Sequence, residues 1–283
     1  MDLADRTLVV KEGDVLDLGE HKLNFVMAPM VHWPEAMMTF ESTHGILFSA
    51  DAFGSFGALD GSLFNDENRN PHGLHSEMRR YYSNIVGKYS GMVQKALAKL
   101  SSARIGAICP LHGLVWRSDP ARVIGLYDRW SRYEADDAAV VIYASMYGNT
   151  AQMADHIARR IAEAGVRDIR VYDVSKTHVS YLISEIWRCR GVLLGSCAYN
   201  TQMFPLMENL TRDLLHAGPK DRLLGVFGTY SWNGGGVKNL NAFAEQIGWE
   251  TVAPSAEILG RPTCEKYAAC DALADAMACR LKK

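Results

Sequence analysis

Residues 139–283 alternate short apolar runs with segments of helical periodicity, and this alternation restricts the possible folds more than any other feature. The apolar runs are AVVIYAS, IRVYDV, GVLLGSC and LLGVFGTY, with TVAPSAEILG as a last strand candidate before a C-terminal helix. The first helical segment, TAQMADHIARRIAEAG, places Met153, Ile157 and Ile161 on one face and stops at Gly165. We expect those three side chains to be core. Strands that alternate with helices favour an α/β fold with a doubly wound parallel sheet.

The sequence before the acidic stretch YEADDAA (133–139) has a different pattern. KLNFVMAP, HGILFSAD and IGAICPLHG each look like a strand that ends in polar residues, and SEMRRYYSNIVGKYSGMVQKALAKL has helical character. We therefore expect two domains, residues 1–135 and 136–283. A chain of 283 residues gives each of them enough material for a core.

Composition and charge argue against several classes of protein. The formal net charge of −2 gives no electrostatic reason to bind nucleic acid or an anionic membrane. No apolar run has the length needed to span a bilayer, and MDLADRTLVVKEGD has no features of a secretion signal. The six cysteines form no Cys-x-x-Cys pair, which argues against a zinc ribbon or a rubredoxin-type site. Scattered thiols suit a reducing compartment, so we expect a cytoplasmic protein.

Three polar loops follow strand ends in the second half: SMYGNT (145–150), SCAYNTQMFP (196–205) and TYSWNGGG (229–236). In a parallel sheet, ligands bind beyond the carboxyl ends of the strands, where the strand order reverses. The hydroxyls of Ser145 and Thr150, together with backbone N–H groups at a helix start, can hold a phosphate there.

The other two loops carry Tyr199, Tyr230 and Trp232, which can sandwich a planar ring, and glycines that permit a close backbone approach. Taken alone, a hydroxyl-rich helix start usually only caps its helix, and a tryptophan in a glycine-rich loop usually packs on the surface. Three such loops at successive strand ends favour a ligand site. The candidate cofactor-binding residues are Ser145, Met146, Tyr147, Gly148, Asn149, Thr150, Ser196, Cys197, Ala198, Tyr199, Asn200, Thr229, Tyr230, Trp232, Asn233, Gly234 and Gly235.

With these loops, residues 139–283 resemble a flavodoxin domain. In that family the first loop holds the phosphate of FMN, and the second and third loops flank the isoalloxazine ring. The resemblance therefore implies FMN as a cofactor. Related second loops more often carry Pro or Thr where this chain has Cys197 and Ala198, which we expect to alter the flavin environment rather than flavin binding.

The first half places one potential metal ligand after each of three apolar strands, within the motifs HWPE, LFSADAFG and CPLHG. The ligands are His32, Asp51 and His112, and imidazole with carboxylate suits iron, manganese or zinc. By spacing alone this triple is a weak signal, since nine histidines produce many such triples by chance. Other histidines, which we expect to be surface or hydrogen-bonded residues, are His44, His72 and His75.

Eighteen residues separate His32 from Asp51, and sixty separate Asp51 from His112. With this spacing, the three motifs closely resemble those of the metallo-β-lactamase-like domain of flavodiiron proteins. That family fuses such a domain, which holds a non-haem di-iron centre, to a flavodoxin domain. The resemblance covers essentially the whole chain and implies that FMN passes electrons to iron, which reduces O2 to water or NO to N2O. It also implies that His32 binds one iron, that His112 binds the other, and that Asp51 bridges them.

The family's remaining metal ligands lie in a His-x-Glu-x-Asp-His motif upstream of the stretch that matches HWPE. Residues 1–31 contain no such motif, so we expect only the second half of a metallo-β-lactamase-like αββα sandwich and an incomplete di-iron site. Three explanations stay open. The first is that the chain is a fragment of a longer protein or results from a start-site error. The second is that another chain supplies the missing half of the domain. The third is that the metal site is lost. Retention of the three ligand-bearing motifs favours the first two explanations.

The leading functional hypothesis is thus an FMN-dependent oxidoreductase of flavodiiron type. The resemblance implies a head-to-tail homodimer or higher oligomer, and a separate electron donor such as a rubredoxin or its reductase. The contrasting hypothesis is a flavodoxin-like electron carrier with an inactive metal domain. A zinc-dependent hydrolase is the weakest alternative, because an attached flavin domain has no obvious role in hydrolysis.

Overall fold

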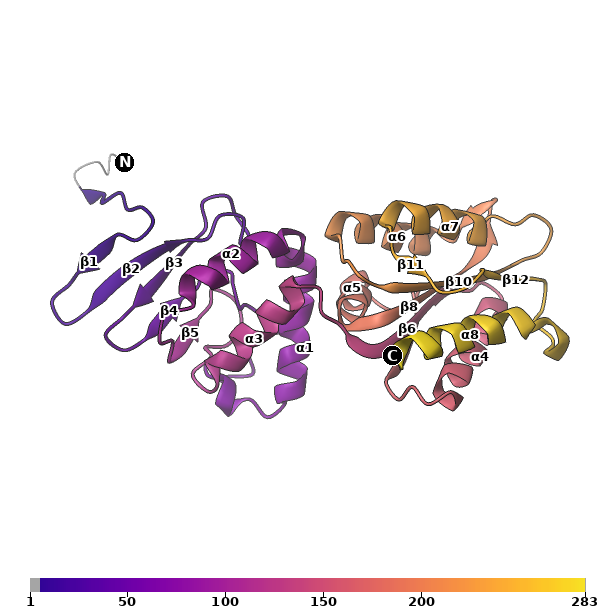
Figure 1. Ribbon diagram of the computed structural model, residues 1–283, viewed down its shortest axis with the longest axis horizontal. Helices are drawn as coiled ribbons and strands as arrows, with labels where there is room; N and C mark the ends of the chain where they lie inside the picture. Colours follow the sequence, from indigo (N-terminus) through magenta and orange to yellow (C-terminus); the bar gives the residue numbers. More distant parts are fainter. Residues whose placement is uncertain (1–5, 283) are drawn as a thin grey trace. The chain divides into compact units, whose positions relative to one another are not determined.

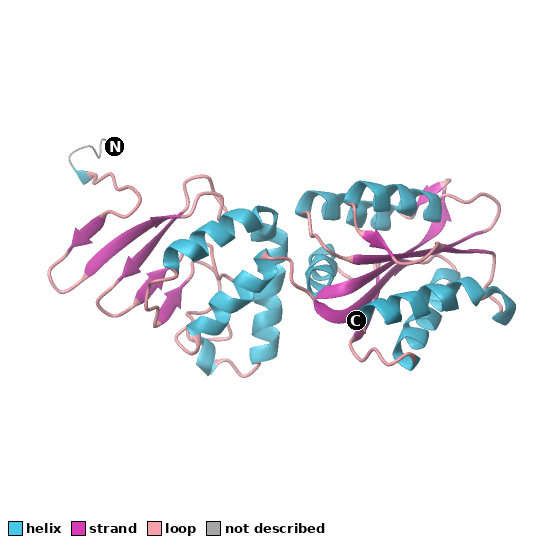
Figure 2. Cartoon of the chain, in the orientation of Figure 1, coloured by secondary structure: helices cyan, strands magenta, loops and turns pink. Residues whose placement is uncertain are grey.

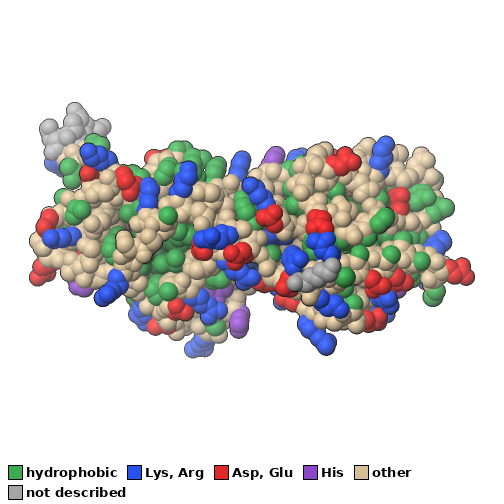
Figure 3. Space-filling view, in the orientation of Figure 1, with side chains coloured by type: hydrophobic (Ala, Val, Ile, Leu, Met, Phe, Trp, Pro, Cys, Tyr) green, Lys and Arg blue, Asp and Glu red, His purple; other side chains and the backbone are tan. Residues whose placement is uncertain are grey.

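The computed structural model describes residues 6–282, and the chain divides into two compact units, Met1–Arg132 and Tyr133–Lys283. This division lies close to the expected boundary between residues 135 and 136. No helix among the described residues combines the length and the apolar character that a bilayer span requires. On the face shown in Figure 3, Lys and Arg side chains are interspersed with Asp and Glu side chains.

The first unit contains one five-stranded sheet in which neighbours in sequence are neighbours in space (Figure 1). Its strands are β1 (Val15–Asp17), β2 (Lys22–Met27), β3 (Met37–Glu41), β4 (Ile46–Phe48) and β5 (Ala107–Cys109). Strands β1 to β4 pair antiparallel, whereas β5 pairs parallel with β4. Strands β2, β4 and β5 therefore run in the same direction, and their carboxyl ends lie at the same end of the sheet.

The helices of the first unit gather on one side of this sheet (Figure 2). They are α1 (Pro71–Tyr81), α2 (Ser90–Leu100) and α3 (Pro120–Ser131), with the short turns η2 (Asn65–Glu67), η3 (Tyr82–Val86) and η4 (Gly87–Tyr89). The segment expected to be helical is helical throughout, with a π-helical turn (η3) and a 3-10 turn (η4) joining α1 to α2. Leu47 and Ile108, partners on one sheet face, are fully buried, whereas Phe48 on the other face is 48% exposed.

The second unit has the expected doubly wound parallel sheet, in the order β11-β10-β8-β6-β7, with β12 also paired to β10. The strands are β6 (Asp136–Ala144), β7 (Ile169–Asp173), β8 (Cys189–Tyr199), β10 (Leu223–Tyr230), β11 (Glu250–Thr251) and β12 (Ala256–Leu259). The strand order reverses between β6 and β8. TVAPSAEILG was expected to be a single strand, but it forms parts of two, β11 and β12, because Pro254 lies between them and cannot donate a ladder hydrogen bond.

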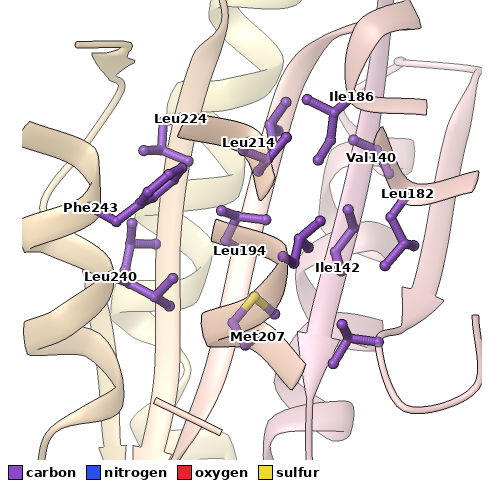
Figure 4. Packing of buried hydrophobic residues seen from close by; sticks show 14 of the residues in the cluster. Val140, Ile142, Leu182, Ile186, Leu194, Met207, Leu214, Leu224, Leu240 and Phe243 are labelled. Carbon is purple, nitrogen blue, oxygen red and sulfur yellow. The ribbon is translucent and has the colours of Figure 1, made fainter. Parts of the chain in front are cut away.

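Helices cover both faces of this sheet. One face packs against α5 (Val179–Arg188), α6 (Pro205–Ala217) and α7 (Gly236–Ile247), and the other against α4 (Asn149–Glu163) and α8 (Ala268–Leu281). Figure 4 shows the first of these cores, where Leu194 and Leu224 of the sheet meet Met207, Leu240 and Phe243 of the helices. The other core contains the three residues predicted from helical periodicity, which are fully buried: Met153, Ile157 and Ile161. The short turn η5 (Cys264–Lys266) precedes α8.

Candidate functional site

A cavity of about 380 Å³ lies beyond the carboxyl ends of β6, β8 and β10, within the size range of small-molecule sites. This is the edge of the sheet at which the strand order reverses, where ligands bind in open α/β sheets. The cavity is lined by Ser145, Met146, Tyr147, Asn149, Cys197, Ala198, Asn200, Thr201, Thr229, Tyr230, Ser231, Trp232 and Asn233. Sequence reasoning missed Thr201 and Ser231, although both lie inside the loops that it identified.

The first loop leaves a buried hydroxyl and an uncapped helix start together. Gly148 precedes α4 with φ of +81°, a left-handed conformation that favours glycine, and no side chain caps the helix. Ser145 Oγ is buried and has no hydrogen-bond partner. Thr150 is fully buried, and its Oγ1 lies 2.8 Å from Thr229 Oγ1. Ser145 and the helix N-terminus are therefore available to an anion, while Thr150 ties the first loop to the third.

The second loop is a β-hairpin rather than an irregular loop. Strand β8 continues to Tyr199 and pairs with β9 (Gln202–Met203) across a two-residue turn in which Asn200 and Thr201 both have positive φ. Ser196 is fully buried, donates to the Cys197 carbonyl at 2.8 Å and accepts from the Phe204 N–H at 3.0 Å. The Ser196 side chain therefore stabilises this segment and does not line the cavity.

The aromatic residues around the cavity have different environments. Tyr199 does not line it, and its ring instead packs edge-on against Phe204 with centroids 6.1 Å apart. Tyr147 and Trp232 line the cavity and are 84% and 86% exposed, so both can contact a ligand at its rim. Burial raises the pKa of the Cys197 thiol, although a backbone hydrogen bond from Met146 partly opposes this, so the cavity wall carries a neutral thiol at neutral pH.

Close packing between the third and second loops requires two of the glycines. A Cβ atom on Gly235 would lie 2.2 Å from the Thr201 carbonyl oxygen, and one on Gly236 would lie 2.8 Å from that of Ser196. Gly234 is not restricted in this way, since its nearest neighbour would be a Glu257 oxygen at 3.4 Å. Gly235 and Gly236 thus allow the two loops that form the cavity wall to pack closely. Gly234 and Gly235 do not themselves line the cavity.

These features fit FMN. The unpartnered Ser145 hydroxyl and the N-terminus of α4 would hold the phosphate, and the aromatic rim would contact the flavin ring.

Replacing Ser145 with Ala is expected to weaken FMN binding about 10- to 100-fold, because a hydrogen bond to a charged group contributes roughly 1.5–3 kcal/mol. The folded protein loses no internal hydrogen bond, so its stability should not fall. Fluorescence titration of the apoprotein with FMN measures the change. Ser255→Ala, which removes an exposed hydroxyl bonded to Asn241, is the control. Equal FMN affinity in Ser145→Ala and in wild type would contradict the assignment.

The candidate metal ligands lie together beyond the carboxyl ends of β2, β4 and β5. Asp51 Oδ2 is 3.5 Å from His32 Nε2, and Asp51 Oδ1 is 3.1 Å from His112 Nε2. Each carboxylate oxygen thus faces a different imidazole. This arrangement suits a carboxylate that bridges two metal ions.

Backbone contacts join the loops that carry these ligands. The Leu111 N–H donates to the Ala50 carbonyl at 2.9 Å, and the Ser55 N–H donates to the His112 carbonyl at 3.2 Å. Gly113 permits the close approach, since a Cβ atom there would lie 2.1 Å from Ser55 Oγ. These contacts between the loops after β4 and β5 therefore fix the position of Asp51 relative to His112.

The buried Tyr81 lies beside the metal-ligand candidate His112. The rings of Tyr81 and His112 have centroids 5.6 Å apart. Burial and the Asp51 charge raise the pKa of Tyr81 well above its ordinary value, so its hydroxyl stays protonated. Trp33 lies beside His32, with ring centroids 5.8 Å apart, and is 58% exposed.

The residues in hand fit a di-iron centre only in part. They offer one imidazole to each metal and one shared carboxylate, which is too few for the first shell of two irons. Within residues 6–282, no other His, Cys, Asp or Glu joins them in a compact group of three or more possible ligands.

Comparisons with known proteins agree with both halves of this description. A flavodoxin family model matches residues 141–271, and a model of the ODP family beta lactamase matches residues 3–113. Rubredoxin oxygen:oxidoreductase from Desulfovibrio gigas superposes with a TM-score of 0.90 at 28% identity, over 97% of this chain and 69% of that chain. The chain belongs to the flavodiiron protein family.

Other relatives agree with this assignment. An anaerobic nitric oxide reductase flavorubredoxin from Escherichia coli is 34% identical over 246 residues, which cover 86% of this flavodiiron chain and 51% of that protein. The chain thus spans about half the length of the curated relatives it matches. The flavodiiron protein from Giardia intestinalis, at 24% identity and a TM-score of 0.91 over 97% of this chain and 68% of its own, shows the shared fold.

Proposed function

We propose that this flavodiiron chain is part of an FMN-dependent reductase that converts O2 to water, NO to N2O, or both, at a non-haem di-iron site. The observation that carries the proposal is the Asp51 carboxylate, whose two oxygens face His32 and His112 separately. The cavity of the second unit supports an FMN site in the same chain. A metal-ligand set without a flavin site would not suit this chemistry.

FMN accepts electrons in pairs and delivers them singly, and iron offers open coordination positions to a diatomic ligand. In this proposal the chain binds the FMN phosphate through Ser145 and the start of α4, and it holds one face of the metal pair. The remaining metal ligands come from outside residues 6–282, on another segment or another chain.

The partners follow from the same proposal. A rubredoxin-type protein supplies electrons, as the names of the Desulfovibrio gigas and Escherichia coli relatives suggest for those proteins. A head-to-tail homodimer in the cytoplasm would bring the FMN of one chain near the irons of another.

A second candidate is a flavodoxin-like electron carrier with an inactive metal domain. It is favoured by the small number of metal ligands among the described residues. An anaerobic assay separates the two functions. An electron donor in excess keeps the flavin reduced, and the consumption of added O2 or NO is followed with an electrode. The reductase consumes NO, or converts O2 to water without hydrogen peroxide, over many turnovers per chain, whereas the carrier consumes no NO and releases hydrogen peroxide from O2.

A further inference from the structure

A second cluster of metal-ligating side chains lies in the first unit, at the other end of its sheet. His21 precedes β2, Glu41 is the last residue of β3, and His44 lies in the turn between β3 and β4. Because β3 runs antiparallel to β2 and β4, all three positions fall at the end opposite to the carboxyl ends of β2 and β4. The cluster is therefore separate from the Asp51 centre and takes no part in the proposed reductase.

The distances within the cluster suit a single metal ion. Each residue offers a ligand atom, and all three atoms lie within 4.8 Å of one another. His44 Nδ1 is 3.3 Å from Glu41 Oε2, and His21 Nδ1 is 3.6 Å from Glu41 Oε1. Ligand atoms at roughly 2.0–2.2 Å from a tetrahedral zinc are themselves about 3.3–3.6 Å apart. Small rotations of the two imidazoles would therefore complete a zinc-like geometry.

Glu41 offers a fixed, ionised carboxylate. Its side chain is 6% exposed, and its carboxylate accepts the backbone N–H groups of Thr43 at 2.7 Å and His44 at 2.8 Å. Burial raises the pKa of Glu41, but these N–H donors outweigh that effect and lower it to about 2. Each carboxylate oxygen keeps a lone pair that can coordinate a cation.

Hydrogen bonds already connect the two turns that carry the cluster. The Ser42 N–H donates to the Lys22 carbonyl at 3.0 Å, and the Thr43 hydroxyl donates to the Glu20 carbonyl at 2.9 Å. These bonds hold the turn before β2 beside the turn after β3, so binding of a cation requires little reorganisation of the backbone.

We propose that His21, Glu41 and His44 bind a divalent cation of the zinc class, which clamps the β1–β2 turn to the β3–β4 turn. Two imidazoles and a carboxylate are a ligand set that zinc and neighbouring transition metals accept. The histidine side chains are 47% and 60% exposed, so the fourth position faces water. The role assigned to the cation is structural, and its binding to the native state would stabilise the first unit by mass action.

Zinc binding to the full chain, measured by equilibrium dialysis and by thermal unfolding of the first unit, tests the proposal. The parent is His32→Ala/His112→Ala, which removes the other candidate site. We expect this parent to bind zinc and to unfold at a higher temperature when zinc is present. Adding His21→Ala and His44→Ala should weaken zinc binding by more than about 100-fold and abolish the thermal shift.

Adding His72→Ala and His216→Ala to the same parent removes two exposed histidines elsewhere and should change neither result. Equal zinc uptake with and without His21 and His44 would overturn the proposal, as would a parent that shows no thermal shift. The Gln variants of both histidines keep a polar side chain, and they replace the Ala variants if those fail to fold.

Discussion

Replacing Arg222 with Met is expected to lower the free energy of unfolding of the second unit by about 3–5 kcal/mol, because several buried carbonyls lose their donor at once. Arg222 is 1% exposed. Burial lowers the pKa of Arg222 to about 10, so the guanidinium remains charged at neutral pH. It donates to the carbonyl oxygens of Ile186 at 2.8 Å, Trp187 at 2.5 Å, Tyr133 at 2.9 Å and Lys220 at 2.5 Å.

Urea unfolding followed by tryptophan fluorescence measures this change, since Trp187 and Trp249 are buried in the same unit. Arg212→Met is the matched control, because the exposed Arg212 side chain donates to the Asn209 side chain on the surface of α6. It should change the free energy of unfolding by less than about 0.5 kcal/mol. If Arg222→Met were as mild as the control, the carbonyls would not depend on this guanidinium.

Replacing Asp51 with Asn is expected to lower O2 or NO reduction by more than about 100-fold, since even mutations of the residues behind metal ligands typically cost 10- to 100-fold. Asparagine keeps the size of the side chain but removes the charge and one of the two oxygens that face His32 and His112. Iron content should fall in parallel, while FMN content should stay at the wild-type level because the cavity lies in the other unit.

Asp60→Asn controls for the loss of a carboxylate in the first unit. Asp60 is exposed and accepts the Ser62 N–H at 3.2 Å, away from the metal ligands. Turnover and iron content should match those of wild type. An Asp51→Asn protein with normal iron and normal turnover would show that the carboxylate does not bridge the metals.

Much of the fold could be predicted from the sequence because strand and helix periodicities are local. LLGVFGTY matches β10, and the apolar stripe of α4 is buried as periodicity predicts. The β8–β9 hairpin was missed because its turn residues, Asn200 and Thr201, adopt positive φ without a glycine to signal it.

The candidate site could be predicted only to the level of loops. Strand ends indicate which loops meet, but the direction of each side chain depends on register and packing. Thr150 thus bonds to Thr229, and Ser196 bonds within its own segment. His44 is exposed and bonded to Glu41, as expected, but its proximity to His21 depends on the pairing of β2 with β3.

The amounts of FMN and iron per chain test the central claim most directly. The protein is purified anaerobically together with any segment or chain that accompanies it, and both are measured by absorbance and elemental analysis. The account predicts about one FMN and about two irons per chain. About one FMN with negligible iron would contradict it and would make this chain an electron carrier.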